Sequence, residues 1–178
     1  MVYDGVLEGR YVDLKSVTVE DAEFTLGIRM DPELTKYLPR INNTLEQQIM
    51  WIKQQRRKPG DYFFVVWDKN GNRIGTNSIY NINGEEGESG RLAIRGNSFQ
   101  SIEAQLLMSD FSYNVIGLEN VVSYVQDGND KALRYGAVFG GVVLEKSVDE
   151  NGVILLKHSC TKTAFANARK KLERMLYR

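Results

Sequence analysis

Cysteine and histidine each occur only once in the sequence, as Cys160 and His158. A single cysteine excludes an intramolecular disulfide. A zinc site needs three or four ligands, and no second cysteine or histidine is present to complete a set with these two. We therefore predict no metal site, and we interpret the segment His158–Cys160 as part of a strand.

The chain also lacks an excess of charge of either sign, because 23 lysines and arginines balance 23 aspartates and glutamates. A neutral chain has no general electrostatic attraction to nucleic acid or to anionic lipid. No apolar stretch approaches the length of a membrane span, and the first residues lack the basic and apolar segments of a signal peptide. These absences predict a cytoplasmic protein with no nucleic-acid partner and no membrane partner.

Proline is scarce, with 3 residues, and the sequence contains no repeat, linker or low-complexity tract. A chain of 178 residues fits one domain with one core. We therefore predict a single domain over residues 1–178.

Helix start signals are clear in the first third of the chain. Thr18 followed by Asp21 and Thr44 followed by Gln47 each form a capping box, which is typical of a helix N-terminus. Pro32 suits the first turn of a further short helix. The predicted helices span about 18–30, 32–38 and 44–58.

Strand signals begin with the alternating residues 10–16 and dominate the middle of the chain. The apolar run 62–67 precedes Asn70–Gly71, a tight hairpin turn, and residues 74–83 and 88–94 follow as two further strands. Residues 62–94 therefore predict an antiparallel meander.

The second half alternates helices and strands. Ser98 or Ser101 caps a buried helix that Gly117 ends. The remaining predicted elements are a strand at 121–125, a helix at 129–138, a hairpin of 142–145 with 153–157, and an amphipathic helix at 163–178. A helix between two strands favours a parallel pair, and hairpins favour antiparallel pairs. The predicted fold class is α/β (α+β), with a mixed, mostly antiparallel sheet flanked by helices on both faces.

This order resembles the GNAT superfamily of N-acetyltransferases, in the branch of ribosomal-protein and amino-sugar acetyltransferases. The similar segments lie at 7–22, 29–34, 74–80, 117–121 and 129–140, a distributed pattern over roughly residues 7–146. The resemblance implies acetyl-CoA as cosubstrate and a small-molecule primary amine as acceptor. It leaves a homodimer open.

The resemblance places the diphosphate of acetyl-CoA at the loop that opens the helix after the third meander strand. A helix N-terminus with unused N–H groups suits an anion. Of the family's loop glycines only Gly96 is present, and a plain capped helix is the alternative interpretation. Asn129 either hydrogen-bonds the pantetheine arm or caps its own helix. The predicted cofactor contacts are Leu92, Ile94, Gly96, Asn97, Ser98, Phe99, Gln100, Ser101 and Asn129.

Proton transfer needs a base, because only the neutral amine attacks a thioester. The resemblance assigns this role to Glu88, whose alternative is a solvated acid near a turn. The family's tyrosine, which protonates the thiolate, falls on Gly136. Tyr135 lies one residue earlier, about 100° around the helix, and either reaches the thiolate or packs. Without it, water can protonate a leaving group as acidic as a thiol.

Arg29 and Tyr80 are the predicted substrate residues. Arginine can bind a phosphate or carboxylate and tyrosine can stack on a ring, with structural pairing as the alternative for both. Three functions follow from the resemblance: acetylation of an amino sugar, free or nucleotide-linked, for surface polysaccharide; acetylation of a protein N-terminus; or ligand binding without catalysis.

Overall fold

The computed structural model describes residues 1–38 and 40–178. Within them the strands form one sheet in the order β1-β2-β3-β4-β5-β6-β8-β7. The strands are β1 (Val6–Glu8), β2 (Val12–Ser16), β3 (Tyr62–Asp68), β4 (Arg73–Asn83), β5 (Glu86–Ile94), β6 (Asn120–Gln126), β7 (Val142–Val148) and β8 (Ile154–Thr161). Only the β5–β6 pair is parallel among these strands, which confirms the predicted mixed, mostly antiparallel sheet.

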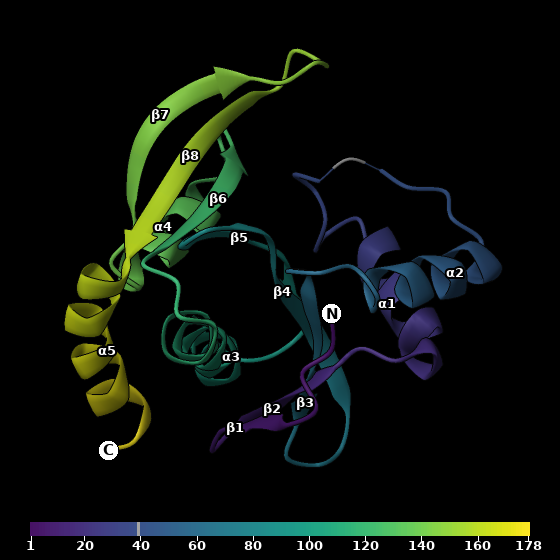
Figure 1. Cartoon of the computed structure of the whole chain (residues 1–178), viewed down its shortest axis with the longest axis horizontal. Coiled ribbons are helices and arrows are strands. Elements are labelled where there is room, and N and C mark those ends of the chain that lie inside the picture. Colours follow the sequence, from purple (N-terminus) through teal and green to yellow (C-terminus); the bar gives the residue numbers. More distant parts are fainter. Residues whose placement is uncertain (39) are drawn as a thin grey trace.

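Helices cover both faces of this sheet (Figure 1). The helices are α1 (Ala22–Met30), α2 (Leu45–Gln55), α3 (Ser98–Asp110), α4 (Asp130–Val138) and α5 (Lys162–Leu176), with a 3₁₀ turn at Val19–Asp21 and a π-helical turn at Phe111–Ile116. Helices α1 and α2 lie on one side, and α3 and α5 lie on the other. The sheet therefore separates two compartments, and each has its own apolar core.

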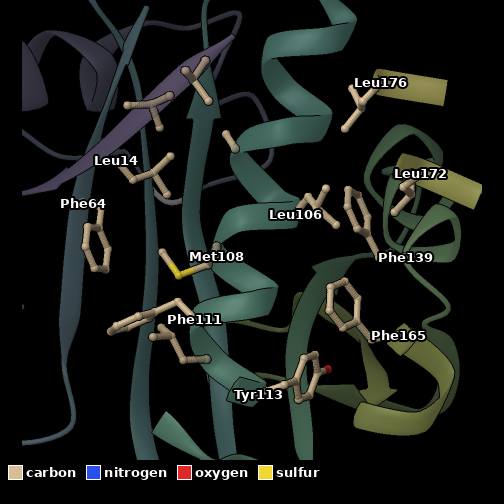
Figure 2. Packing of buried hydrophobic residues seen from close by; sticks show 14 of the residues in the cluster. Leu14, Phe64, Leu106, Met108, Phe111, Tyr113, Phe139, Phe165, Leu172 and Leu176 are labelled. Carbon is tan, nitrogen blue, oxygen red and sulfur yellow. The ribbon is translucent and has the colours of Figure 1, made fainter. Parts of the chain in front are cut away.

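Strand β3 joins the two cores. Phe64 and Val66 belong to the larger core, and Phe63 and Val65 belong to the smaller one. A strand buried on both faces reads as a continuous apolar run, which explains the sequence 62–67. Figure 2 shows the larger core, with α3 between the sheet and α5. Its labelled residues are Leu14, Phe64, Leu106, Met108, Phe111, Tyr113, Phe139, Phe165, Leu172 and Leu176.

Two of the predicted helix starts need correction. Residues 32–38 form turns instead of a helix, because the Asp31 carboxylate accepts hydrogen bonds from the backbone N–H groups of Glu33 and Leu34 and favours a turn. The cap of α3 is Asn97, not Ser98 or Ser101. Its extended backbone (φ −76°, ψ 174°) lets Oδ1 accept from the Gln100 N–H at 3.0 Å. The capping box predicted for α2 is present.

The C-terminal hairpin is longer than the sequence pattern indicated. Strand β8 extends to Thr161, so it includes the segment His158–Cys160. It lies between β6 and β7, which leaves β7 at the sheet edge, and the hairpin projects away from the helices (Figure 1). The final helix begins at Lys162, since Thr161 caps it.

Two features are absent from the described residues. None of the helices there is long and apolar enough to cross a membrane. No group of three or more His, Cys, Asp or Glu side chains gathers there as a set of metal ligands.

Candidate active site

The two parallel strands of the sheet separate shortly after they meet. The β5–β6 pairing joins Glu86 to Asn120, Gly87 to Val121 and Glu88 to Val122, and it ends there. Beyond this point β5 pairs only with β4, and β6 pairs only with β8. The facing strand edges therefore offer main-chain N–H and C=O groups to an extended ligand.

A β-bulge lies beside this opening. Ser78 pairs with Gly90 and Thr76 with Ala93, so Arg91 and Leu92 share one position opposite β4. Arg91 adopts a left-handed backbone conformation with φ of +50°. The predicted cofactor residues Leu92 and Ile94 lie on the stretch of β5 that β6 leaves open.

The α3 N-terminus follows directly after this stretch. The Asn97–Gln100 capping box uses the backbone N–H groups of both residues. Helix geometry leaves the N–H groups of Ser98 and Phe99 without intrahelical acceptors. Gly96 makes room for the box, because a Cβ there would lie 2.7 Å from Gln100 Oε1. The predicted phosphate loop is therefore a capped helix end that retains two donors.

The predicted diphosphate site can be tested at Ser98: if this helix end binds acetyl-CoA, replacing Ser98 by proline should weaken that binding about tenfold with no loss of fold stability. Proline removes the Ser98 N–H, yet it suits the first helical position. Asn97 has the extended backbone that a residue before proline requires. One charge-assisted hydrogen bond contributes about 1.5–3 kcal/mol. Calorimetry should show the loss for Ser98→Pro and near-wild-type affinity for Ser98→Ala, which keeps the N–H; equal affinities would exclude this donor.

Glu88 and Tyr80 are direct cross-strand partners on β5 and β4. The Tyr80 hydroxyl donates to Glu88 Oε1 at 2.8 Å, and Asn81 Nδ2 donates to Glu88 Oε2 at 2.9 Å. Burial and the negative charge of Glu88 raise the pKa of Tyr80 well above its usual range. Gly90 makes room for this ring, since a Cβ there would lie 2.4 Å from the Tyr80 hydroxyl. The predicted base and one predicted substrate residue thus form a hydrogen-bonded pair.

A cavity of about 310 Å³ lies between α1, α2 and the strands β3–β5. Arg29 of α1 and Tyr80 of β4 both line it, so the structure brings the two predicted substrate residues into one site. Burial lowers the pKa of the Arg29 guanidinium, which stays charged at neutral pH all the same. Glu88 is hydrogen-bonded to the cavity wall through Tyr80.

Arg91, which the sequence reasoning missed, lines the same cavity. Its guanidinium binds the buried Asp61 through both oxygens, at 2.7 and 3.0 Å. No motif marks either residue. The bulge that directs Arg91 into this face of the sheet is the decisive feature, and its only signal in the sequence is Gly90.

Helix α4 carries the remaining predicted residues. The Tyr135 hydroxyl donates to the Ser101 carbonyl oxygen at 2.7 Å, which joins α4 to the start of α3, and burial raises the pKa of Tyr135. Asn129 caps α4, with Oδ1 accepting from the Ala132 N–H at 3.2 Å. Gly136 faces the buried His158, since a Cβ there would lie 2.5 Å from His158 Cε1.

Gly136→Ala should therefore destabilise the fold by about 1–3 kcal/mol. Alanine raises helix propensity, so a helical glycine in open space should instead gain up to about 1 kcal/mol. Gly27 of α1 is such a position, with nothing within 4 Å of an added Cβ, and Gly27→Ala is the matched control. In a His158→Ala background, which lacks the ring, Gly136→Ala should reduce the free energy of unfolding much less than it does in the wild-type chain, as measured by denaturant titration. No coupling between the two sites would contradict the contact.

A mixed sheet that opens between its two parallel strands, with a helix N-terminus beside the opening, defines the GNAT fold. The chain belongs to the GNAT acetyltransferases: the family described as acetyltransferase (GNAT) domain matches residues 12–136. This confirms the resemblance to the GNAT superfamily, and the branch within it stays a prediction.

Solved structures show the same fold. A nucleotide-linked sugar GNAT, FdhC in its apo form, superposes with a TM-score of 0.83 and 20% identity, covering 98% of this chain and 99% of that chain. Spermidine N-acetyltransferase from Vibrio cholerae, in complex with CoA and spermine, has a TM-score of 0.80 and 17% identity over 89% and 100%. A GCN5-related N-acetyltransferase from Brucella melitensis has a TM-score of 0.81 and 17% identity over 98% and 86%. No curated protein matches in sequence.

Proposed function

We propose that this protein transfers the acetyl group of acetyl-CoA to the primary amine of a small amino sugar. The observation that carries the proposal is the Tyr80–Glu88 pair, hydrogen-bonded at 2.8 Å. Glu88 lies where β5 and β6 separate. Tyr80 lines the cavity on the face of the sheet that α1 and α2 cover. An acyl donor and an amine can meet there from opposite sides.

The residues fit acetyl-CoA, which supplies an acetyl group activated as a thioester. The Ser98 and Phe99 N–H groups suit its diphosphate, as does the predicted segment Gly96–Ser101 around them. The open edge of β5 at Leu92 and Ile94 suits the amide groups of an extended pantetheine arm. Asn129 lies across the opening, at the start of α4.

Glu88 is the proposed base, acting through Tyr80. The Tyr80 oxygen accepts a proton from the substrate ammonium as its own proton passes to Glu88, so the amine becomes neutral and charge is conserved. Tyr135 was predicted either to protonate the thiolate or to pack. Its bond to the Ser101 carbonyl favours packing. As the C–N bond forms and the C–S bond breaks, the second proton of the amine nitrogen then reaches the thiolate through water.

The cavity favours an amino sugar over a polyamine. Among the described residues that line it are two arginines and no aspartate or glutamate. A polycation needs carboxylates, whereas a basic lining attracts anionic groups. A protein N-terminus requires an open groove for the following residues, and this site is a cavity of about 310 Å³.

Acetyl-CoA calorimetry followed by thiol release tests the proposal. The acceptor panel contains hexosamines, nucleotide-linked amino sugars, spermidine and an N-terminal ribosomal-protein peptide. We expect micromolar acetyl-CoA binding and fastest thiol release with an amino sugar. Absence of any affinity for acyl-CoA would refute the proposed acetyltransferase activity. Binding of acetyl-CoA without turnover of any acceptor in the panel would identify a ligand-binding domain.

A further inference from the structure

Arg91 lies in an aromatic enclosure at the wall of the cavity. Its guanidinium carbon is 4.3 Å from the ring centre of Tyr80, 5.2 Å from that of Trp51 and 5.5 Å from that of Phe63. Asp61, with only 2% of its surface exposed, holds the same group by two hydrogen bonds. The guanidinium is therefore held in one orientation before any ligand arrives.

Arg91 retains binding capacity in this position. A guanidinium has five N–H donors, and Asp61 accepts from Nη1 and Nη2 at normal distances. The side chain is 26% exposed. A preorganised guanidinium loses little side-chain entropy when it binds an anion.

The other described residues that line the cavity include no carboxylate. Arg29 and Asn43 supply further donors, whereas Gln48 already donates to Thr25 at 3.0 Å and the Thr25 hydroxyl already donates to the Ala22 carbonyl oxygen at 3.1 Å. The nearest carboxylates along this wall are already engaged: Asp61 by Arg91, and Glu88 by Tyr80 and Asn81. Two cations with the Asn43 amide suit the several oxygens of a phosphate better than the two of a carboxylate.

A shallow hollow adjoins the cavity along α2. It measures about 440 Å³ and shares Asn43 and Trp51 with the cavity. Met50, which is 53% exposed, also lines it. The cavity is at the lower end of ligand-site sizes, roughly 300–1,000 Å³, so it accommodates a sugar phosphate, and a larger acceptor would extend into this hollow.

We propose that Arg91 and Arg29 bind a phosphate group of the acceptor and that the nucleoside attached to this phosphate lies in the hollow at Trp51 and Met50. The acceptor is then a nucleotide-linked amino sugar, with its amine toward Tyr80 and Glu88. This inference rests on the proposed function, because it assumes that the cavity is the acceptor site. It makes Arg91 and Trp51 specificity-determining residues.

The direct test is calorimetry of thymidine and uridine diphosphates on protein saturated with CoA, which blocks the cosubstrate's own diphosphate site. We expect at least one nucleoside diphosphate to bind, and to bind at least about tenfold more tightly than pyrophosphate or the nucleoside alone. Failure of both nucleoside diphosphates to bind the CoA-loaded protein would overturn the proposal.

Arg91→Lys should weaken this binding about tenfold or more, since lysine keeps the charge beside Asp61 but loses the planar fork. Arg73→Lys is the matched control. Arg73 also binds a buried aspartate, Asp21, at 2.7 Å and lies over a tryptophan ring, Trp67, at 4.9 Å, but it is not among the lining residues. Equal affinity in both variants would overturn the role of Arg91.

Trp51→Leu keeps the experiment decisive where Arg91→Lys fails to fold. It should reduce nucleoside diphosphate affinity about tenfold and pyrophosphate affinity much less, the smaller loss arising because Trp51 also lies beside the Arg91 guanidinium; an equal loss for both ligands would refute the nucleoside site. Failure of this inference is distinct from failure of the proposed function. Suppose that thiol release occurs with a hexosamine that carries no phosphate and is no faster with its nucleotide-linked form. The protein is then an acetyltransferase, and the proposed phosphate site is refuted.

Discussion

Glu88→Gln is expected to lower kcat about hundredfold while acetyl-CoA affinity changes less than about twofold. The glutamine side chain still accepts a hydrogen bond from Tyr80, so the pocket keeps its shape, but it cannot take up a proton at neutral pH. The loss therefore falls on turnover. Stopped thiol-release assays give kcat, and calorimetry gives the affinity for acetyl-CoA.

Glu86→Gln is the matched control for this result. Glu86 lies two residues earlier on β5 and accepts a hydrogen bond from an asparagine, Asn120, at 2.8 Å, as Glu88 does from Asn81. It should leave kcat within about twofold. Tyr80→Phe should reproduce most of the Glu88→Gln loss, and the double variant should lose little more, because residues of one relay are not additive. Unchanged kcat in Glu88→Gln would remove Glu88 from the mechanism.

Glu103→Gln is expected to destabilise the fold by about 3 kcal/mol. Glu103 is fully buried on α3. Its carboxylate accepts from the backbone N–H groups of Arg10, Tyr11 and Val12 at 2.8, 2.6 and 2.9 Å, and from the Tyr177 hydroxyl at 2.8 Å. In glutamine an NH₂ group replaces one of the two oxygens that accept these bonds. At least one of the four surrounding N–H and O–H groups therefore loses its acceptor.

Thermal unfolding measures this effect, with an expected decrease in Tm of about 6–12 °C. The control is Glu119→Gln, since Glu119 is exposed and pairs with Lys162 at 3.0 Å. An exposed ion pair contributes little, and we expect a change below about 0.5 kcal/mol. A Tm for Glu103→Gln as high as that of the control would show that the carboxylate bonds do not stabilise the turn between β1 and β2.

Local signals made the fold around the proposed cofactor site predictable. Residues 96–101 are contiguous, and a strand followed by a capped helix can be recognised from neighbouring residues alone. The cap itself was predicted wrongly, as Ser98 or Ser101 instead of Asn97, because serine and asparagine cap equally well. Which one does so depends on where the preceding strand ends.

The cavity proposed to bind the acceptor was only partly predictable. The resemblance predicted Arg29 and Tyr80 as substrate residues, and both line this cavity, whereas Arg91 and Asp61 are 30 residues apart and no periodicity relates them. A one-residue bulge changes the face on which every later side chain of a strand lies. Arg91 therefore lines the cavity because of the bulge, and the alternation of residues along β5 does not predict this.

Gly136 illustrates the same limit. The sequence identified it as a glycine at the family's tyrosine position, and the structure explains it by a ring from β8, 22 residues away. His158 first read as a strand residue without a function. Its contact with α4 arises because β8 lies between β6 and β7.

By itself, the sequence determined the family, the mixed sheet, the helix that opens the proposed diphosphate site and the order of helices and strands, except for strand β1, which was not predicted, and for the helix predicted at 32–38, which does not form. These depend on periodicity, caps and turns, which are interactions within a few residues of the chain. Only the tertiary structure decided which arginines share the cavity, how Glu88 is hydrogen-bonded to it and why residue 136 is glycine. Those facts depend on strand register and on packing between distant segments, and neither is encoded in local pattern.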